Sequence, residues 1–281
     1  MFRIKNMSVE DYYFAVRLTD TMNWELSKDD FKFMMELNPD GCFVLLHDSK
    51  KVGISTTIRF DNAGWIGNLI VKESYRERGG GSLLVRHSIN HLIKKDVQTI
   101  GLYSYIDKIP FYKRFGFKYN TELLVLKGEG FPESKLNRAC LRKAGKENIQ
   151  EIVNLDNHCF GASRRKLLEK IILNPDNVCF TSIENKQIIG FVMAKINEQM
   201  AEVGPLVCQR GRNIVANNLL KAILNELEGI EVFIFIPKNE LSILNLLFKS
   251  GFREMFRVAR MFYGHPIVKD CIYLAESLER G

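Results

Sequence analysis

The sequence lacks the features that would mark a membrane, secreted or disulfide-rich protein. No apolar run approaches the ~20 residues needed to span a bilayer, and the first residues, Met-Phe-Arg-Ile-Lys-Asn-Met-Ser, contain no apolar core of signal-peptide length. No two cysteines have Cys-x-x-Cys spacing, and we interpret all six as reduced thiols. They are Cys42, Cys140, Cys159, Cys179, Cys208 and Cys271. We therefore expect a cytoplasmic protein that does not act at a membrane.

Positive charge exceeds negative charge only slightly. The net charge is +7 and the sequence pI is about 9.0, which suits a phosphorylated ligand but is too weak to indicate nucleic acid. Apolar residues make up 46% of the chain and charged residues 26%, an ordinary globular balance. A chain of 281 residues is long enough for two domains, each with its own core.

The order of predicted elements occurs twice along the chain. A polar linker at residues 128–135 separates the two series, and we place domains at residues 1–129 and 136–281. Asn-Pro-Asp stands at residues 38–40 and again at 174–176, and Gly-Phe at 116–117 and 251–252. Within each series, alternating apolar stretches predict strands and amphipathic stretches predict helices. The pattern indicates an internal duplication of an α/β unit.

The stretch from Trp65 to Leu84 contains the strongest functional signal. It predicts a strand, then a basic turn with three successive glycines, then a helix. Glycine lets a ligand approach the backbone closely, and the amides at a helix N-terminus favour an anion. The spacing does not fit the Rossmann fingerprint, and the Gly-Lys-Ser/Thr of a P-loop is absent. On the glycines alone, a flexible loop that caps the helix remains an alternative to a phosphate site.

Two motifs together resemble the GNAT superfamily of N-acyltransferases. Val71-x4-Arg76-x2-Gly79-x-Gly81 is similar to its acyl-CoA loop, and Phe111-Tyr112-x3-Gly116-Phe117 is similar to its next motif. The resemblance covers residues 2–125 in full and the second half in element order only. It extends to a bacterial and archaeal subgroup with two such domains in tandem. It implies two mixed, mostly antiparallel sheets flanked by helices, with the first sheet splayed open beside residues 69–71.

The resemblance also implies where acetyl-CoA binds, and it gives no reason to expect a metal. The pantetheine arm would pair with the strand at Leu69, Ile70 and Val71, and the pyrophosphate would lie on the turn. The implied cofactor residues further include Arg76, Glu77, Arg78, Gly79, Gly80, Gly81, Ser82, Tyr103 and Phe111. One departure is Lys108, which stands where many members have alanine.

Tyr112 occupies the family's usual position for the general acid, facing the CoA sulfur. The alternative is that Tyr112 is only a packing aromatic beside Phe111. No general base is evident, because the strand at Trp65–Val71 has no Glu where some members have one. We assign Trp24, Glu25 and Asn68 to the acceptor site, Asn68 as a residue that could orient a water.

The second half loses the key residues of both motifs. Aligning Val207 with Val71 places Val215 and Asn217 on Gly79 and Gly81. Aligning the Gly-Phe pairs places Leu247 on Tyr112. We therefore expect a degenerate second domain that does not bind CoA.

The expected activity is acetyl transfer from acetyl-CoA to a primary amine on a small molecule or peptide. The alternatives are a CoA-responsive binding protein without turnover and a nucleic-acid binder, and no motif supports the latter. The sequence does not indicate the acceptor, the acyl chain length or the oligomeric state.

Overall fold

The structure is a computed structural model that describes residues 1–24, 26–132, 140–197, 200–267 and 269–281. The strands are β1 (Phe2–Asn6), β2 (Cys42–His47), β3 (Lys50–Phe60), β4 (Ala63–Val71), β5 (Thr99–Tyr105), β6 (Lys118–Glu129), β7 (Leu141–Lys143), β8 (Val178–Glu184), β9 (Gln187–Asn197), β10 (Met200–Gln209), β11 (Glu231–Pro237), β12 (Arg253–Tyr263) and β13 (Cys271–Leu274). The helices are α1 (Tyr12–Asp20), α2 (Lys28–Leu37), α3 (Gly80–Ile93), α4 (Ile109–Lys113), α5 (Ile149–Phe160), α6 (Arg165–Leu173), α7 (Asn213–Glu226) and α8 (Leu241–Lys249).

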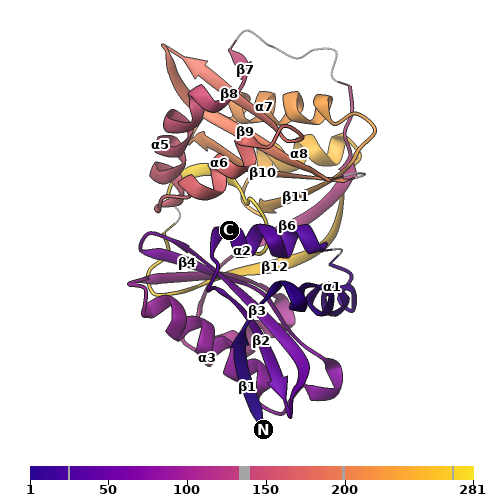
Figure 1. The fold of residues 1–281 in the computed structure, drawn as a ribbon. Helices are drawn as coiled ribbons and strands as arrows, with labels where there is room; N and C mark the ends of the chain where they lie inside the picture. The colour runs from indigo at the N-terminus through magenta and orange to yellow at the C-terminus, as the bar shows by residue number, and fades with distance from the viewer. Residues whose placement is uncertain (25, 133–139, 198–199, 268) are drawn as a thin grey trace.

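The two halves share one mixed sheet through an exchange of strands. The sheet order is β1-β2-β3-β4-β5-β12-β6-β11-β10-β9-β8-β7, and β13 pairs with β10 outside this path. Strand β12 of the second half therefore lies between β5 and β6, and β6 of the first half pairs with β11. Outward from the central β12–β6 pair, the order on one side mirrors the order on the other. Figure 1 shows the two halves, with β6 and β12 crossing between them.

Local sequence signals explain where the first two helices begin. Ser8 and Asp11 form a capping box before α1, and Ser27 and Asp30 form one before α2. The Ser27 Oγ accepts from the Asp30 backbone N–H at 3.3 Å, while the Ser27 N–H donates to the Asp30 carboxylate at 2.8 Å. These caps fix helices whose apolar faces then pack on the sheet.

The hydrophobic core divides according to the two faces of the sheet. On the face that carries α1, α2, α5 and α6, one cluster runs through both halves and includes Phe31, Trp65 and Phe160. On the other face, α7 and α8 cover one cluster in the second half. There α3 covers a separate cluster in the first half, which includes Ile66 and Val85. The halves are therefore joined both by strands and by a shared core on a single face.

Several expectations from the sequence need revision. Cys159 and Cys271 form a disulfide, so the interpretation of all six cysteines as reduced thiols is wrong for these two. Cys42, Cys140, Cys179 and Cys208 are free. The first-half helix begins at Gly80 rather than near Ser82, so two glycines belong to its first turn. The short strand β13 has no counterpart in the expected elements.

The domain limits of residues 1–129 and 136–281 stay a prediction. They divide the sequence, but β12, from the second part of the sequence, lies beside β5 in the sheet of the first. No helix in the described part of the chain is long and apolar enough to cross a membrane.

Candidate active site

The sheet opens between β4 and β5, as the sequence predicted. These strands run parallel and pair from Ala63–Thr99 to Ile66–Leu102. β4 then continues to Val71, and no strand of the described residues pairs with residues 67–71 on this edge. Backbone N–H and C=O groups along this edge are thus available to an extended ligand.

A bulge shapes β4 where the strands part. The β3–β4 register shifts between Thr56–Gly67 and Ile54–Ile70. Asn68 lies in this bulge with φ +48° and a buried side chain. Its Nδ2 lies 3.3 Å from the Thr56 Oγ1, but its Oδ1 has no hydrogen-bond partner among the described residues. A buried acceptor without a partner is costly unless a ligand satisfies it.

The glycines serve three different purposes at the start of α3. Gly79 is the N-cap residue at φ +89°, a conformation that disfavours other residues. A Cβ at Gly80 would lie 2.8 Å from Leu45, so Gly80 permits close packing on β2. A Cβ at Gly81 would lie 3.6 Å from the Phe111 ring, where the turn faces α4. The turn thus presents its backbone amides with little side-chain cover.

The two arginines of the turn contact neighbouring residues of the first domain. The Arg76 Nε donates to the Val71 carbonyl at 3.0 Å and so joins the turn to the end of β4. The Arg78 guanidinium lies 5.6 Å from the centre of the Tyr75 ring. Glu77 is exposed and has φ +61°. Ser82, half-buried, lies in the first turn of α3.

Tyr112 lies on α4, on the same face of the sheet as the glycine turn. Its ring packs edge-on against Phe111 at 5.0 Å and Phe117 at 6.1 Å. Burial raises the pKa of the Tyr112 hydroxyl above its usual range, so the group stays protonated at neutral pH. Lys108, the departure from the family motif, forms an ion pair with Asp107 at 2.7 Å just before α4.

The other face of the opening carries Trp24 and Tyr103. The Trp24 Nε1 donates to the Tyr105 hydroxyl at 2.7 Å, which fixes the segment between α1 and α2 against β5. Tyr103 packs against Trp65 at 5.1 Å in the shared core, away from Phe111, and its buried hydroxyl has no partner among the described residues. Tyr103 thus lies on the same face as Trp24, and its assignment to the cofactor stays a prediction. Glu25 lies outside the described residues.

The same opening in the second half is filled by the chain itself. β10 has an equivalent register shift, between Val203 and Leu206, and its parallel pairing with β11 ends at Val203–Ile234. Beyond that point, β13 pairs with residues 206–209 of β10. The Ala275 N–H then donates to the Phe235 carbonyl at 3.0 Å, which continues the inserted segment between β10 and β11.

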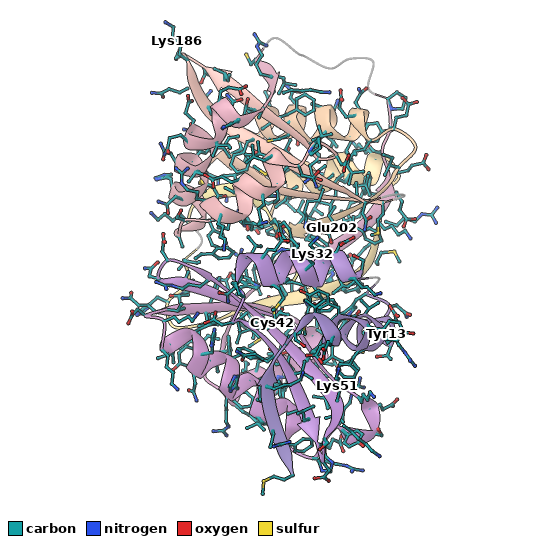
Figure 2. All side chains as sticks on the ribbon, in the orientation of Figure 1. Tyr13, Lys32, Cys42, Lys51, Lys186 and Glu202 are labelled. Carbon is teal, nitrogen blue, oxygen red and sulfur yellow. A yellow bond between two sulfur atoms is a disulfide. The ribbon has the colours of Figure 1, made fainter. Side chains whose placement is uncertain are left out.

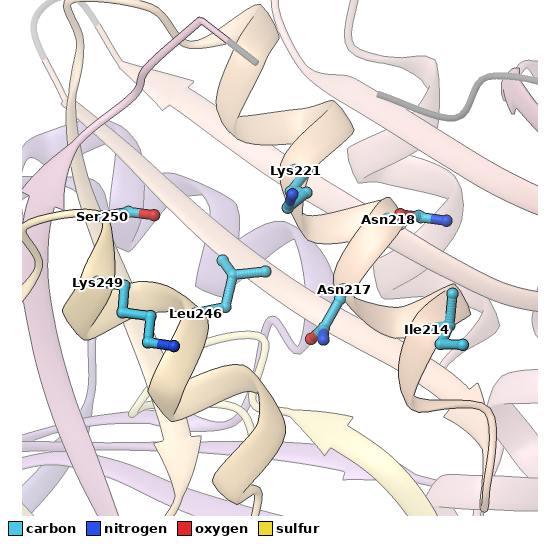
Figure 3. Close-up of a pocket in the computed structure, with 7 residues that line it drawn as sticks. All are labelled: Ile214, Asn217, Asn218, Lys221, Leu246, Lys249 and Ser250. Atoms are coloured by element: carbon cyan, nitrogen blue, oxygen red, sulfur yellow. The ribbon is translucent and has the colours of Figure 1, made fainter. Parts of the chain in front are cut away.

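The second-half turn also differs from the glycine turn. Only residues 210–212 connect β10 to α7. Arg210 there is paired with Asp270 at 2.7 Å and with Glu240 at 3.1 Å. The Asn217 amide donates to the Ser242 hydroxyl at 3.0 Å and so links α7 to α8. Asn217 also lines a groove between these two helices (Figure 3). This groove holds side chains where the first half has glycine.

Sequence reasoning missed the contribution of the C-terminal residues to the first-half site. A Cβ placed on Gly67 would lie 2.7 Å from the Glu279 carbonyl oxygen. The only local signal is Gly67 itself, since a glycine within a strand often marks a close backbone approach. No group of three or more potential metal ligands occurs in the described part of the chain.

Comparison with known proteins agrees with this architecture. The Acetyltransferase (GNAT) domain family matches residues 38–119 and, through a second family of the same description, residues 152–273. The chain belongs to the GNAT superfamily and carries two such domains in tandem. GNAT proteins are acyltransferases, so the general activity is acyl transfer.

Similar proteins align with this chain over nearly their whole length. A holothin acyltransferase from Pseudoalteromonas sp. (strain SANK 73390) is 24% identical over 99% of this chain and 94% of its own. A crystal structure of a putative acetyltransferase from Pyrococcus horikoshii is 23% identical, with a TM-score of 0.84 over 100% of this chain and 96% of its own. A tandem GNAT protein from the clavulanic acid biosynthesis pathway is 13% identical, with a TM-score of 0.64 over 93% and 98%.

Proposed function

We propose that the first GNAT domain, within residues 1–129, transfers an acetyl group from acetyl-CoA to a primary amine of a small molecule or peptide. The observation that carries the proposal is the open edge of β4 at residues 67–71, flanked by the glycine turn and Tyr112 on one face. In the second domain, β13 covers the equivalent edge. We therefore assign one cofactor site to each chain.

The residues of the first domain fit the parts of acetyl-CoA in turn. The free β4 edge suits the amide-bearing pantetheine arm, and the amides from Arg78 to Ser82 suit the pyrophosphate. Gly81 leaves the start of α3 without a side chain beside Phe111, since a Cβ there would contact the ring at 3.6 Å. Acetyl-CoA supplies the thioester carbonyl that the amine attacks.

Tyr112 is the proposed proton donor to the leaving sulfur. A well-placed general acid contributes typically about 10²- to 10⁴-fold to a rate. The raised pKa of Tyr112 keeps its proton available at neutral pH. Asn68 can hold an amine or a water through its unpaired Oδ1. An alkylamine of pKa about 10.4 costs roughly 4–5 kcal/mol to deprotonate at pH 7, so a proton acceptor is also needed.

The decisive experiment is a screen of amines with acetyl-CoA, scored by release of free thiol, beside calorimetry with CoA. We expect one CoA bound per chain and thiol release with at least one amine class. CoA binding without turnover by any amine would instead support a CoA-responsive binding protein. Two CoA molecules per chain, or none, would contradict the assignment of the site.

A further inference from the structure

The C-terminal residues leave the second domain and reach the first. After β13, the chain passes Gly204 so closely that a Cβ there would lie 1.9 Å from the Ala275 carbonyl oxygen. Residues 276–281 then cross to β4 of the first domain. Their end lies between the two halves, near α2 (Figure 1). The same segment thus closes one opening and borders the other.

Contacts define where this segment meets the first domain. A Cβ on Gly67 would lie 2.7 to 2.9 Å from the Glu279 carbonyl oxygen, Cα and Cβ, so a larger residue at 67 would displace the segment. The Arg280 guanidinium lies 5.3 Å from the centre of the Phe33 ring and 3.6 Å from the Met34 sulfur, both on α2. Glu279 is therefore held against the residue of β4 that immediately precedes Asn68.

The face on which Glu279 approaches is opposite to Tyr112. Trp65, two residues before Gly67 on β4, packs in the core shared with α1 and α2. Tyr112 packs in the cluster under α3 and α4. A thioester held in the opening would lie between these faces. The face with Glu279 is also the one that carries Trp24, assigned to the acceptor.

Neighbouring charges leave Glu279 without a counterion of its own. Glu276 is paired with Arg280 at 2.9 Å and with Lys195 of β9 at 2.5 Å. Lys195 is also paired with Glu202 of β10, at 2.6 Å. Figure 2 shows Glu202 near the junction of the halves. No ion pair to Glu279 forms among the described residues.

Burial and these neighbours alter the proton affinity of Glu279. Burial raises the pKa of Glu279 to about 7, with Glu202 and Glu276 adding to the rise and Arg280 and Lys195 opposing it. The group can therefore exist with and without its proton near neutral pH, which general-base catalysis requires. No residue of β4 offers a carboxylate on this face.

We propose that Glu279, carried from the second domain on the segment after β13, accepts the proton of the acceptor amine in the first domain. The inference rests on the proposed acetyl transfer. Glu279 takes one proton from the ammonium group, and the free amine forms the C–N bond as the C–S bond breaks. Tyr112 gives its proton to the sulfur and recovers one from the nitrogen through solvent. Glu279 then releases its proton to water.

The test compares the full-length protein with Glu279→Gln over pH 5.5–9.5, using acetyl-CoA and an amine found by the screen. In the wild type, kcat/KM should rise with pH through about 7, because Glu279 must lose its proton. In Glu279→Gln, kcat/KM at pH 7.5 should fall about 10²- to 10³-fold and this rising limb should disappear. CoA affinity should stay within about twofold, since Glu279 lies on the face away from the cofactor turn.

Two further variants separate chemistry from structure. Glu228→Gln, at an exposed carboxylate after α7, should leave the profile unchanged. Glu279→Ala should regain part of its activity when formate is added, which a purely structural loss would not allow. A wild-type rate and pH profile in Glu279→Gln, or a loss that formate does not restore, would overturn the role of Glu279. Absence of turnover in the wild type would instead overturn the proposed function.

Discussion

The two GNAT domains contain the same opening in the sheet, and only one of them leaves it free. In the first, register shifts from Thr56–Gly67 to Ile54–Ile70, and β4 then runs unpaired on one edge. In the second, the same shift from Ala194–Val203 to Val192–Leu206 is followed by pairing with β13. If only the first domain binds CoA, as we propose, the backbone geometry of the opening is not enough for cofactor binding. The two domains differ in whether another strand of the chain hydrogen-bonds to the exposed backbone edge.

This comparison also suggests what the second domain does. The segment that fills its opening continues to the face of the first domain where we propose that the acceptor binds. Under our proposal, a domain whose own opening is filled by β13 thereby contributes a wall and a proton acceptor to its neighbour. The strand exchange of β6 and β12 and the shared core hold the two surfaces in a fixed relation.

The largest expected effect comes from Tyr112→Phe, because this change removes the proposed proton donor. The second domain has Leu247 at the corresponding position. Removing the hydroxyl should lower kcat about 10²- to 10⁴-fold and leave CoA affinity within a few fold. Steady-state kinetics and calorimetry measure the two quantities separately. Tyr119→Phe, at an exposed tyrosine on β6, is the matched control. An unchanged kcat in Tyr112→Phe would leave Tyr112 with a packing role only.

The next largest effect concerns the anchor of the C-terminal segment. Burial alone would raise the pKa of Glu276, but the charges of Arg280 and Lys195 hold it at about 2. Glu276→Gln leaves the buried Arg280 without its carboxylate partner, while Lys195 keeps Glu202. Loss of a buried partner costs about 3–5 kcal/mol of unfolding free energy. We also expect acyl transfer to weaken, because Glu279 lies on the same segment.

The pH dependence of stability follows from the sign of this shift. A carboxyl whose pKa is lowered in the folded state stabilises the fold above its unfolded pKa, near 4.5. That contribution is lost as pH falls from there toward about 2. Urea unfolding of the wild type and Glu276→Gln should therefore differ most at neutral pH and converge in acid. A constant difference from pH 7 to pH 3 would contradict this account.

Asp11→Asn, in the first domain, should be compared with Glu276→Gln. The pKa of Asp11 also lies at about 2: burial would raise it, but hydrogen bonds from Lys5, Lys51 and Ser8 outweigh this. The lysine side chains are 39% and 35% exposed, so water can solvate them after the substitution. We expect a smaller loss of stability than for Glu276→Gln, with no change in the pH limb of catalysis assigned to Glu279.

Much of this architecture could be predicted from local signals, and the remainder depends on contacts distant in sequence. Capping boxes at Ser8 and Ser27, and glycines at 116 and 251, locate helix ends because those interactions span only a few residues. The exchange of β6 and β12 could not be predicted, since the alternating pattern of a strand does not specify which half of the chain it pairs with.

The role of the C-terminal segment escaped prediction for the same reason. Residues 271–281 have no distinctive motif, and their importance arises from insertion between β10 and β11 and from contact with Gly67. The pairing of Cys159 with Cys271 spans 112 residues and likewise depends on the folded chain. The proposed cofactor motif could be found in the sequence because a phosphate turn requires consecutive residues, whereas the acceptor site that we propose combines residues from both domains.

The smallest expected effect comes from replacing a glycine in either strand-to-helix turn, and it compares the two turns directly. Gly79 and Gly211 have φ values of +89° and +84°, and a Cβ at either would have no atom within 4 Å. Replacing either glycine by alanine therefore imposes a similar backbone strain of about 1–2 kcal/mol. Only at Gly79 does the strained residue cap the helix whose amides we assign to the pyrophosphate.

Gly79→Ala should weaken CoA binding about tenfold, the equivalent of roughly 1.4 kcal/mol, because relief of the strain moves those amides. Gly211→Ala should leave both the CoA affinity and the stoichiometry of one CoA per chain unchanged. The melting temperatures of the two variants should fall by similar amounts. Calorimetry and thermal unfolding of the two variants test this together. Equal losses of affinity would mean that the second turn also contributes to binding, and the distinction between an open and a filled domain would fail.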